Sequence, residues 1–147
     1  MPTPKRIAKM TYVLVPQQDT ARLQEVVHTA RRTCRVAHTL GLKPMSPLLY
    51  FLTFLAPGEF SMEMRRLFYQ WLIRADRIWL QFHDPNVEVL DPLSYDILAD
   101  NQRSRERRPV YQIHQAGDDF HPIPMTYSEV DEILKINLTA GLARACI

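Results

Sequence analysis

The stretch 41–100 constrains the fold more than any other part of the chain, because strand-like and helix-like segments alternate along it. The predicted elements are, in order, a helix end at Gly41, a strand over 43–46, a loop, a helix over 61–75, a buried strand over 78–82 and a helix from Leu93 to about Ser104. Such alternation builds a largely parallel sheet through crossover connections. Ligands of these sheets bind outside the carboxyl ends of the strands.

The flanking segments extend this alternation. Tyr12–Val15 is an apolar run closed by Pro16, which is typical of a strand buried on both faces. Apolar residues then recur at helical spacing up to Leu40, with Thr20 as the predicted N-cap. A further strand is predicted over 109–113. We therefore expect an α/β fold with an open, doubly wound, mainly parallel sheet flanked by helices, a three-layer arrangement like flavodoxin or Rossmann folds, plus an extra C-terminal helix.

The chain divides into three predicted parts: an N-terminal arm over 1–10, a domain over 11–113, and a linker and C-terminal helix over 114–147. Thr126 and Glu129 have the spacing of a capping box, which predicts where the last helix begins. Its apolar positions are Val130, Ile133, Leu134 and Leu138. This helix is expected either to cover an exposed side of the sheet or to exchange with a second copy.

Composition favours a globular protein of the cytoplasm. The chain has 147 residues, 46% of them hydrophobic and 23% charged, with a net charge of +2. No apolar run approaches the roughly 20 residues needed to span a bilayer, so no membrane association is expected. The net charge gives no reason to propose nucleic acid, and the arginine-rich segment 103–108 favours a solvated turn. No histidine has a metal-ligand spacing, and we expect neither metal nor cofactor.

Over residues 11–113 the chain resembles the nucleoside 2-deoxyribosyltransferase-like superfamily, especially its small phage and bacterial members of unassigned role. The resemblance rests on the order and spacing of five elements. These are a strand ending in proline at 12–16, an alanine- and cysteine-containing helix over 30–41, a G-x-x-P-x-x-P-x-x-Y-F segment at 41–51, an Ala-Asp-x-x-Trp strand at 75–79, and a helix with Ser94 and Asp100 ahead of Pro109-Val110.

The resemblance implies a small-molecule ligand, a nucleoside or nucleotide, whose N-glycosidic bond is cleaved or transferred through a carboxylate. Asp100 matches the family's nucleophilic glutamate, and Asp96, four residues earlier, projects from the same side of the helix. The two together would be acid and nucleophile, or otherwise a solvated helix face. The residues expected to bind substrate are Tyr12, Pro16, Gln17, Asp19, Tyr50, Asp76 and Ser94. Family members also form homo-oligomers.

Several of these residues have a structural alternative. Asp76 would hold a ribose hydroxyl or accept from backbone donors, and Tyr12 and Tyr50 would contact the base and sugar or be ordinary aromatics with a surface hydroxyl. Asp96 stands where the family has glycine, and Asp100 is one methylene shorter than glutamate. The alternative function is therefore a catalytically inactive binding or interaction module that keeps the fold and oligomerises through its C-terminal helix.

Overall fold

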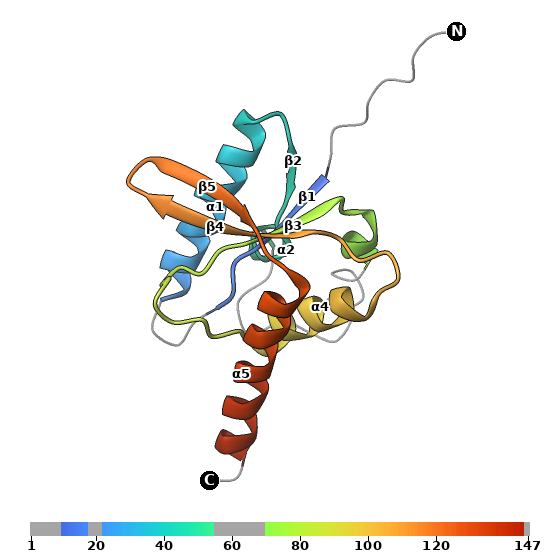
Figure 1. Cartoon of the computed structure of the whole chain (residues 1–147). Helices are drawn as coiled ribbons and strands as arrows, with labels where there is room; N and C mark the ends of the chain where they lie inside the picture. The colour runs from blue at the N-terminus through green and yellow to red at the C-terminus, as the bar shows by residue number, and fades with distance from the viewer. Residues whose placement is uncertain (1–9, 18–21, 55–69, 146–147) are drawn as a thin grey trace, which may run out of the picture.

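The computed structural model of the chain describes residues 10–17, 22–54 and 70–145. Figure 1 shows a sheet with helices around it and a last helix that extends outward. The elements are β1 (Met10–Leu14), α1 (Leu23–Thr39), β2 (Lys43–Met45), α2 (Pro47–Leu52), β3 (Arg77–Leu80), α4 (Pro92–Arg103), β4 (Val110–Ala116), β5 (Asp119–Pro124) and α5 (Tyr127–Ala145). Residues 70–74 are also helical.

The sheet has five strands in the order β2-β1-β3-β4-β5. The first four are parallel, whereas β5 pairs with β4 in the antiparallel direction. The prediction of a mainly parallel α/β sheet is confirmed. Strands β1 and β3 are neighbours, and Leu14 pairs with Leu80. The strand order reverses between β1 and β3, because β2 lies on one side of β1 while β3 and β4 lie on the other.

Alternate residues of β1 contact different helices. Tyr12 and Leu14 belong to the largest apolar cluster, which includes residues of β3, α4 and α5. Val13 and Val15 pack instead with Val26 and Ala30 of α1. A strand with apolar side chains on both sides is a continuous hydrophobic run, as 12–15 is in the sequence.

Helix α1 ends as predicted and begins later than predicted. Gly41 has φ +80°, the N–H of Gly41 donates to His38 O at 3.0 Å, and the N–H of Leu42 donates to Ala37 O at 2.9 Å. This is the Schellman arrangement that glycine allows. Thr20, the predicted N-cap, lies outside the described residues. The prediction is wrong because the N-cap of α1 is Arg22, whose N–H donates to the Glu25 carboxylate at 3.2 Å.

Two predicted loops are regular structure. The segment after β2 forms helix α2, because Pro47 suits the first helical turn and the Ser46 hydroxyl accepts from Leu49 N–H at 3.3 Å. The predicted linker over 114–125 is wrong: residues 114–116 complete β4, and β5 follows after a turn at Gly117, where φ is +63°.

In the helix predicted over 61–75, residues 61–69 lie outside the described residues, while Leu72 and Ala75 are buried.

The register of the β4–β5 hairpin explains why β5 contains two prolines. The N–H of Met125 donates to Val110 O at 2.8 Å, so every second residue from Met125 back along β5 directs its backbone polar groups toward β4. Pro122 and Pro124 fall between these positions, opposite Ile113 and Tyr111. They therefore remove N–H groups that would point away from the sheet, which blocks the pairing of another strand.

Helix α5 begins with the predicted capping box. The N–H of Thr126 donates to Glu129 Oε1 at 3.0 Å, and the N–H of Glu129 donates to the Thr126 hydroxyl at 3.1 Å. The backbone N–H and the side chain of Thr126 both hydrogen-bond the Glu129 carboxylate, and they hold the pKa of this carboxyl below its ordinary value. They fix the start of a helix that continues well past the rest of the fold.

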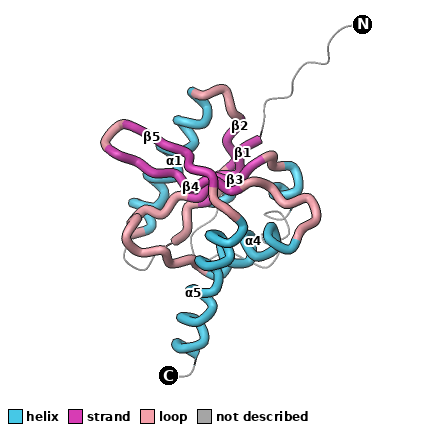
Figure 2. Tube along the Cα trace, viewed as in Figure 1, coloured by secondary structure: helices cyan, strands magenta, loops and turns pink. Residues whose placement is uncertain are grey.

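The apolar positions of α5 are only partly covered. Of the four apolar positions identified in the sequence, Val130, Ile133 and Leu134 are buried in the largest apolar cluster, whereas Leu138 is half-exposed. The beginning of α5 packs on α4, and Figure 2 shows its later turns extending beyond the other described elements. None of the helices in the described ranges combines the length and apolarity needed to cross a membrane.

Candidate functional site

The carboxyl ends of β1 and β3 bring four chain segments together. Pro16 and Gln17 follow β1, and His83 and Asp84 come shortly after β3. The first turns of α1 and α4 contact these segments, as the hydrogen bonds below establish. This is also the point where the strand order reverses, which is where open α/β sheets bind their ligands.

Asp91 joins two of the residues predicted to bind substrate. It is the N-cap of α4, and its Oδ2 accepts from Ser94 N–H at 3.3 Å. Its Oδ1 accepts from the Ser94 hydroxyl at 2.6 Å and from Gln17 N–H at 3.1 Å. One carboxylate therefore fixes the loop after β1 to the first turn of α4, with Pro16 and Ser94 buried and Gln17 exposed.

His83 lies between two side chains of α1. Its Nδ1 is 2.7 Å from the Thr29 hydroxyl, and its Nε2 is 3.5 Å from Glu25 Oε2. A carboxylate only accepts, so the neutral imidazole places its proton on Nε2 and accepts the Thr29 hydroxyl proton at Nδ1. The His83 and Glu25 side chains are 30% and 50% exposed, so a molecule outside the fold can reach this pair.

A second polar contact joins the same two segments further inside. Thr33 is on α1 one turn beyond Thr29, and its hydroxyl contacts the side-chain amide of Gln81. The Thr33 hydroxyl also donates to Thr29 O at 3.0 Å, and both Thr33 and Gln81 are buried. Buried polar side chains are tolerated when they hydrogen-bond one another, so this contact has a structural role in holding α1 against the segment that follows β3.

The predicted catalytic pair lies on α4. Asp96 and Asp100 are both half-buried, and the Asp100 carboxylate forms an ion pair with Arg103 of its own helix. Asp100 follows the N-cap by more than two helical turns, whereas Gln17 and Ser94 contact Asp91 at the beginning of the helix. A catalytic role for Asp96 and Asp100 stays a prediction.

The remaining predicted residues are dispersed. Tyr12 is fully buried in the largest apolar cluster, and Tyr50, on α2, makes edge-to-face contacts with Phe54 and Trp71. Asp76 lies at the amino end of β3, where its Oδ2 accepts from Met10 N–H at 2.8 Å. It thus makes the structural hydrogen bond that was its alternative role. Asp19 lies outside the described residues.

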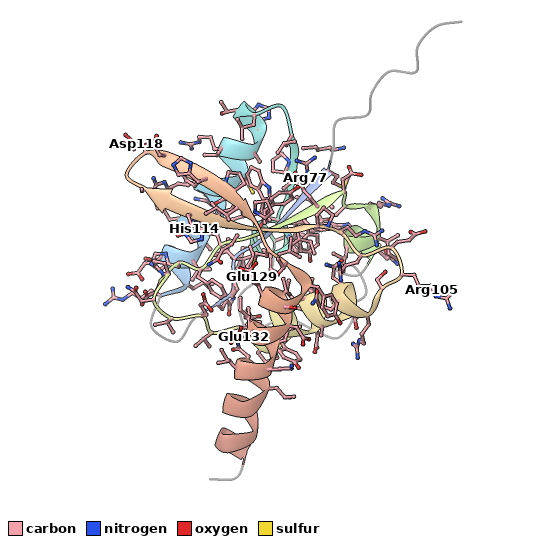
Figure 3. The ribbon with its side chains drawn as sticks, in the orientation of Figure 1. Arg77, Arg105, His114, Asp118, Glu129 and Glu132 are labelled. Atoms are coloured by element: carbon pink, nitrogen blue, oxygen red, sulfur yellow. The ribbon has the colours of Figure 1, made fainter. Side chains whose placement is uncertain are left out.

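The amino ends of the strands carry a different polar network, centred on Arg108. Its guanidinium donates to the backbone oxygens of Ile73 at 2.6 Å, Glu106 at 2.7 Å and Ala75 at 3.2 Å. The side chain of Asn101 binds both the N–H and the C=O of Arg108, each at 3.0 Å. The prediction of a solvated turn is therefore wrong for Arg108. Figure 3 shows that Arg105, in the same turn, points away from the fold.

Charge at the carboxyl ends is mostly negative and disfavours anionic ligands. Among the described residues of this end, the acids are Glu25, Asp84, Glu88 and Asp91, and the basic residues are Arg22 and His83. The first turns of α1 and α4 already receive carboxylates, from Glu25 and Asp91. A phosphate would have to displace them, because helix N-termini bind phosphate through the same N–H groups. Carboxylates with free lone pairs suit hydroxyl donors.

Sequence analysis did not select four of the residues that meet here: Glu25, Thr29, His83 and Asp91. Asp91 carried a local signal, since aspartate before Pro92 is typical of an N-cap followed by the first helical residue. The pairing of His83 with α1 had no local signal, because it depends on which strands are neighbours.

The described residues contain no group of three or more His, Cys, Asp and Glu side chains placed to hold a metal ion. The Cys34 thiol is also poorly suited to chemistry, because burial raises its pKa to about 11. The described residues at the carboxyl ends offer an imidazole, a guanidinium, hydroxyls, amides and carboxylates. Comparison with known proteins identifies no relative: no family model, curated protein or solved structure matches the chain.

Proposed function

We propose that this chain is a nucleoside- or nucleotide-binding α/β protein of the cytoplasm, with a doubly wound three-layer fold like that of flavodoxin and Rossmann proteins. Its ligand lies at the carboxyl ends of β1 and β3. The observation that carries the proposal is the contact of Gln17 and Ser94 through Asp91, at the point where the strand order reverses. Ser94 matches the serine that opens this helix in the deoxyribosyltransferase-like superfamily that the sequence resembles, and Gln17 lies in the loop where this fold places its ligand.

The charges around this end favour a nucleoside over a nucleotide. Sugar hydroxyls would donate to the carboxylates, whereas a phosphate would be repelled by them. The direct test is calorimetric titration of the protein with a panel of nucleosides and their 5′-monophosphates. Saturable binding of a nucleoside supports the proposal. Absence of binding by both sets at millimolar ligand contradicts it.

We further propose that Asp100 attacks the anomeric carbon of the bound nucleoside, with Asp96 beside it as the acid or sugar contact. Attack requires the Asp100 carboxylate to leave its ion pair with Arg103, so the sugar must compete with a guanidinium for it. Base release, followed by chromatography, should fall by at least about 100-fold in Asp100→Asn.

Asp131→Asn is a matched control for this substitution. The Asp131 and Asp100 side chains are each 37% exposed, and each forms an ion pair within its own helix, with Lys135 and Arg103 respectively. Asp131 lies on α5, so its loss should leave base release unchanged. Equal activity in the two variants would remove Asp100 from the mechanism without affecting the binding proposal.

The alternative is a binding or interaction module that forms homo-oligomers through α5. A specific observation favours it: Ile136 and Leu138 are 56% and 51% exposed on a helix that extends beyond the other described elements. Truncation after Lys135 removes both exposed residues and leaves the buried residues Val130, Ile133 and Leu134 in place, so it should convert an oligomer into a monomer in light scattering. An unchanged mass after truncation would exclude this role for α5.

A further inference from the structure

We propose that His83 donates the proton that the departing base requires, with Thr29 and Glu25 as its positioning residues. This inference rests on the proposed function, since it assigns the acid of the same N-glycosidic cleavage. No family motif in the sequence includes His83. The inference comes from the hydrogen-bonded series of hydroxyl, imidazole and carboxylate at the carboxyl ends of β1 and β3.

The two contacts of His83 differ in a way that suits proton donation. The Nδ1–Thr29 contact is 2.7 Å, which holds the ring in one orientation. The Nε2–Glu25 contact is 3.5 Å, longer than a normal hydrogen bond, and it lies on the more exposed side of the cluster. A ligand nitrogen can therefore take the place of Glu25 at Nε2 while Thr29 keeps the ring in position.

This cluster is not needed to attach α1 to β3. Thr33 and Gln81 already join these segments through a fully buried contact. The His83 cluster makes a second connection between the same segments, through Thr29 and Glu25, one to two turns earlier on α1. Its two ionisable side chains, His83 and Glu25, are accessible to solvent. A solely structural contact gains nothing from partial exposure, whereas an acid must reach its ligand.

The proposed step balances as follows. The bond between the anomeric carbon and the base nitrogen breaks, and its electron pair goes to the base. The Nε2 proton of the His83 imidazolium moves to a ring nitrogen of that base. This leaves neutral imidazole with its remaining proton on Nδ1, which donates to the Thr29 hydroxyl. A carboxylate of the protein, Asp100 in the proposed function, forms the ester with the anomeric carbon, and water later hydrolyses it. Solvent then protonates His83 again.

The test compares guanosine with 7-methylguanosine, each as the riboside and the 2′-deoxyriboside. The base of 7-methylguanosine already carries a positive charge and leaves without being protonated. In His83→Gln, kcat for guanosine should fall by about 100-fold or more, while kcat for 7-methylguanosine should stay within about threefold of the wild-type value. His114→Gln, at an exposed histidine of the hairpin, is the control and should change neither.

Glu25→Gln provides a second variant, because the Glu25 side chain is half-exposed and its substitution leaves the buried core intact. It should lower kcat for guanosine by about tenfold, with less effect on 7-methylguanosine. Equal losses on both substrates, or no loss in His83→Gln, would overturn the role of His83 while cleavage itself stands. Wild-type protein that releases no base from either substrate would overturn the cleavage proposal and this inference together.

Discussion

The two ends of the parallel strands use polar side chains for different purposes. At the amino ends, Arg108, Asn101 and Asp76 bind backbone groups, and they close the ends of strands and helices. At the carboxyl ends, Thr29 and Glu25 contact the His83 side chain, and His83 and Glu25 remain accessible to solvent. Polar residues committed to the backbone stabilise a fold. Those that bind other side chains, near the surface, are available for chemistry.

The difference follows from the direction of the chain. Helices that connect parallel strands begin at the carboxyl ends and finish at the amino ends, so one end of the sheet collects helix N–H groups and the other collects helix C=O groups. Arg108 satisfies such C=O groups, whereas Glu25 and Asp91 satisfy N–H groups. The acidic character of the carboxyl ends is thus partly a consequence of capping.

The sharpest way to test this contrast is Asn101→Ala at the amino ends. The substitution removes both hydrogen bonds to the Arg108 backbone from a fully buried site, so we expect a loss of about 2–3 kcal/mol in the free energy of unfolding. Urea denaturation measures this loss, with Gln115→Ala on the exposed hairpin as control. Nucleoside affinity should not change. A loss of affinity at unchanged stability would reverse the assignment of the two ends.

Asp91→Ala tests the carboxyl ends by the same measurement. Loss of the N-cap should reduce stability by about 1–2 kcal/mol. Because Gln17 and Ser94 lose their common partner, nucleoside affinity should also fall, by roughly tenfold. The control is Glu132→Ala, at an exposed carboxylate of α5. Destabilisation with unaltered affinity would make Asp91 as purely structural as Asn101.

The free side of β5 extends the comparison to backbone groups. Replacing Pro122 and Pro124 by valine restores two outward N–H groups, so we expect concentration-dependent association in sedimentation velocity. Unfolding free energy should change by less than about 1 kcal/mol. Pro85→Val, in an exposed loop, should remain unassociated. If the double variant also stays unassociated, the prolines do not protect this strand.

The smallest effect is expected at Glu129, a capping carboxylate outside both ends. Its pKa is lowered in the folded protein, so its contribution to stability is complete above the ordinary value of 4.5 and is lost as the pH falls through the lowered value. Wild type and Glu129→Gln should therefore differ in stability at pH 7 and converge near pH 3, as measured by urea unfolding. A difference that persists at low pH would mean that the carboxylate charge is not what Glu129 contributes.

Local signals accounted for much of the fold. The apolar run 12–15, the helical spacing up to Leu40 and the glycine at 41 identified β1 and α1, and the capping box identified α5. The β4–β5 hairpin was missed because its two prolines are typical of loops, and only the register explains how a strand accommodates them. The spacing identified Leu138 as an apolar position of the last helix but not what covers it, and the structure leaves it half-exposed because α5 extends past the surface it packs on.

The candidate site was less predictable than the fold. Gln17 and Ser94 were selected from the sequence and do lie together, but the carboxylate that joins them was overlooked. His83 and Glu25 are far apart in the chain, and no spacing rule relates them. Their contact depends on the pairing of β3 with β1 and on the packing of α1 against these strands. Both are features of the tertiary structure, which no local sequence pattern specifies.

One side chain connects the outward-pointing helix α5 to the loop that precedes α4. The Asn137 amide donates to Glu88 O at 3.0 Å, and its oxygen accepts from Leu90 N–H at 2.8 Å. The next residue along is the Asp91 cap. A partner that binds the end of α5 would therefore also act on the segment that contains Asp91. Free movement of α5 would require both hydrogen bonds of the Asn137 side chain to break.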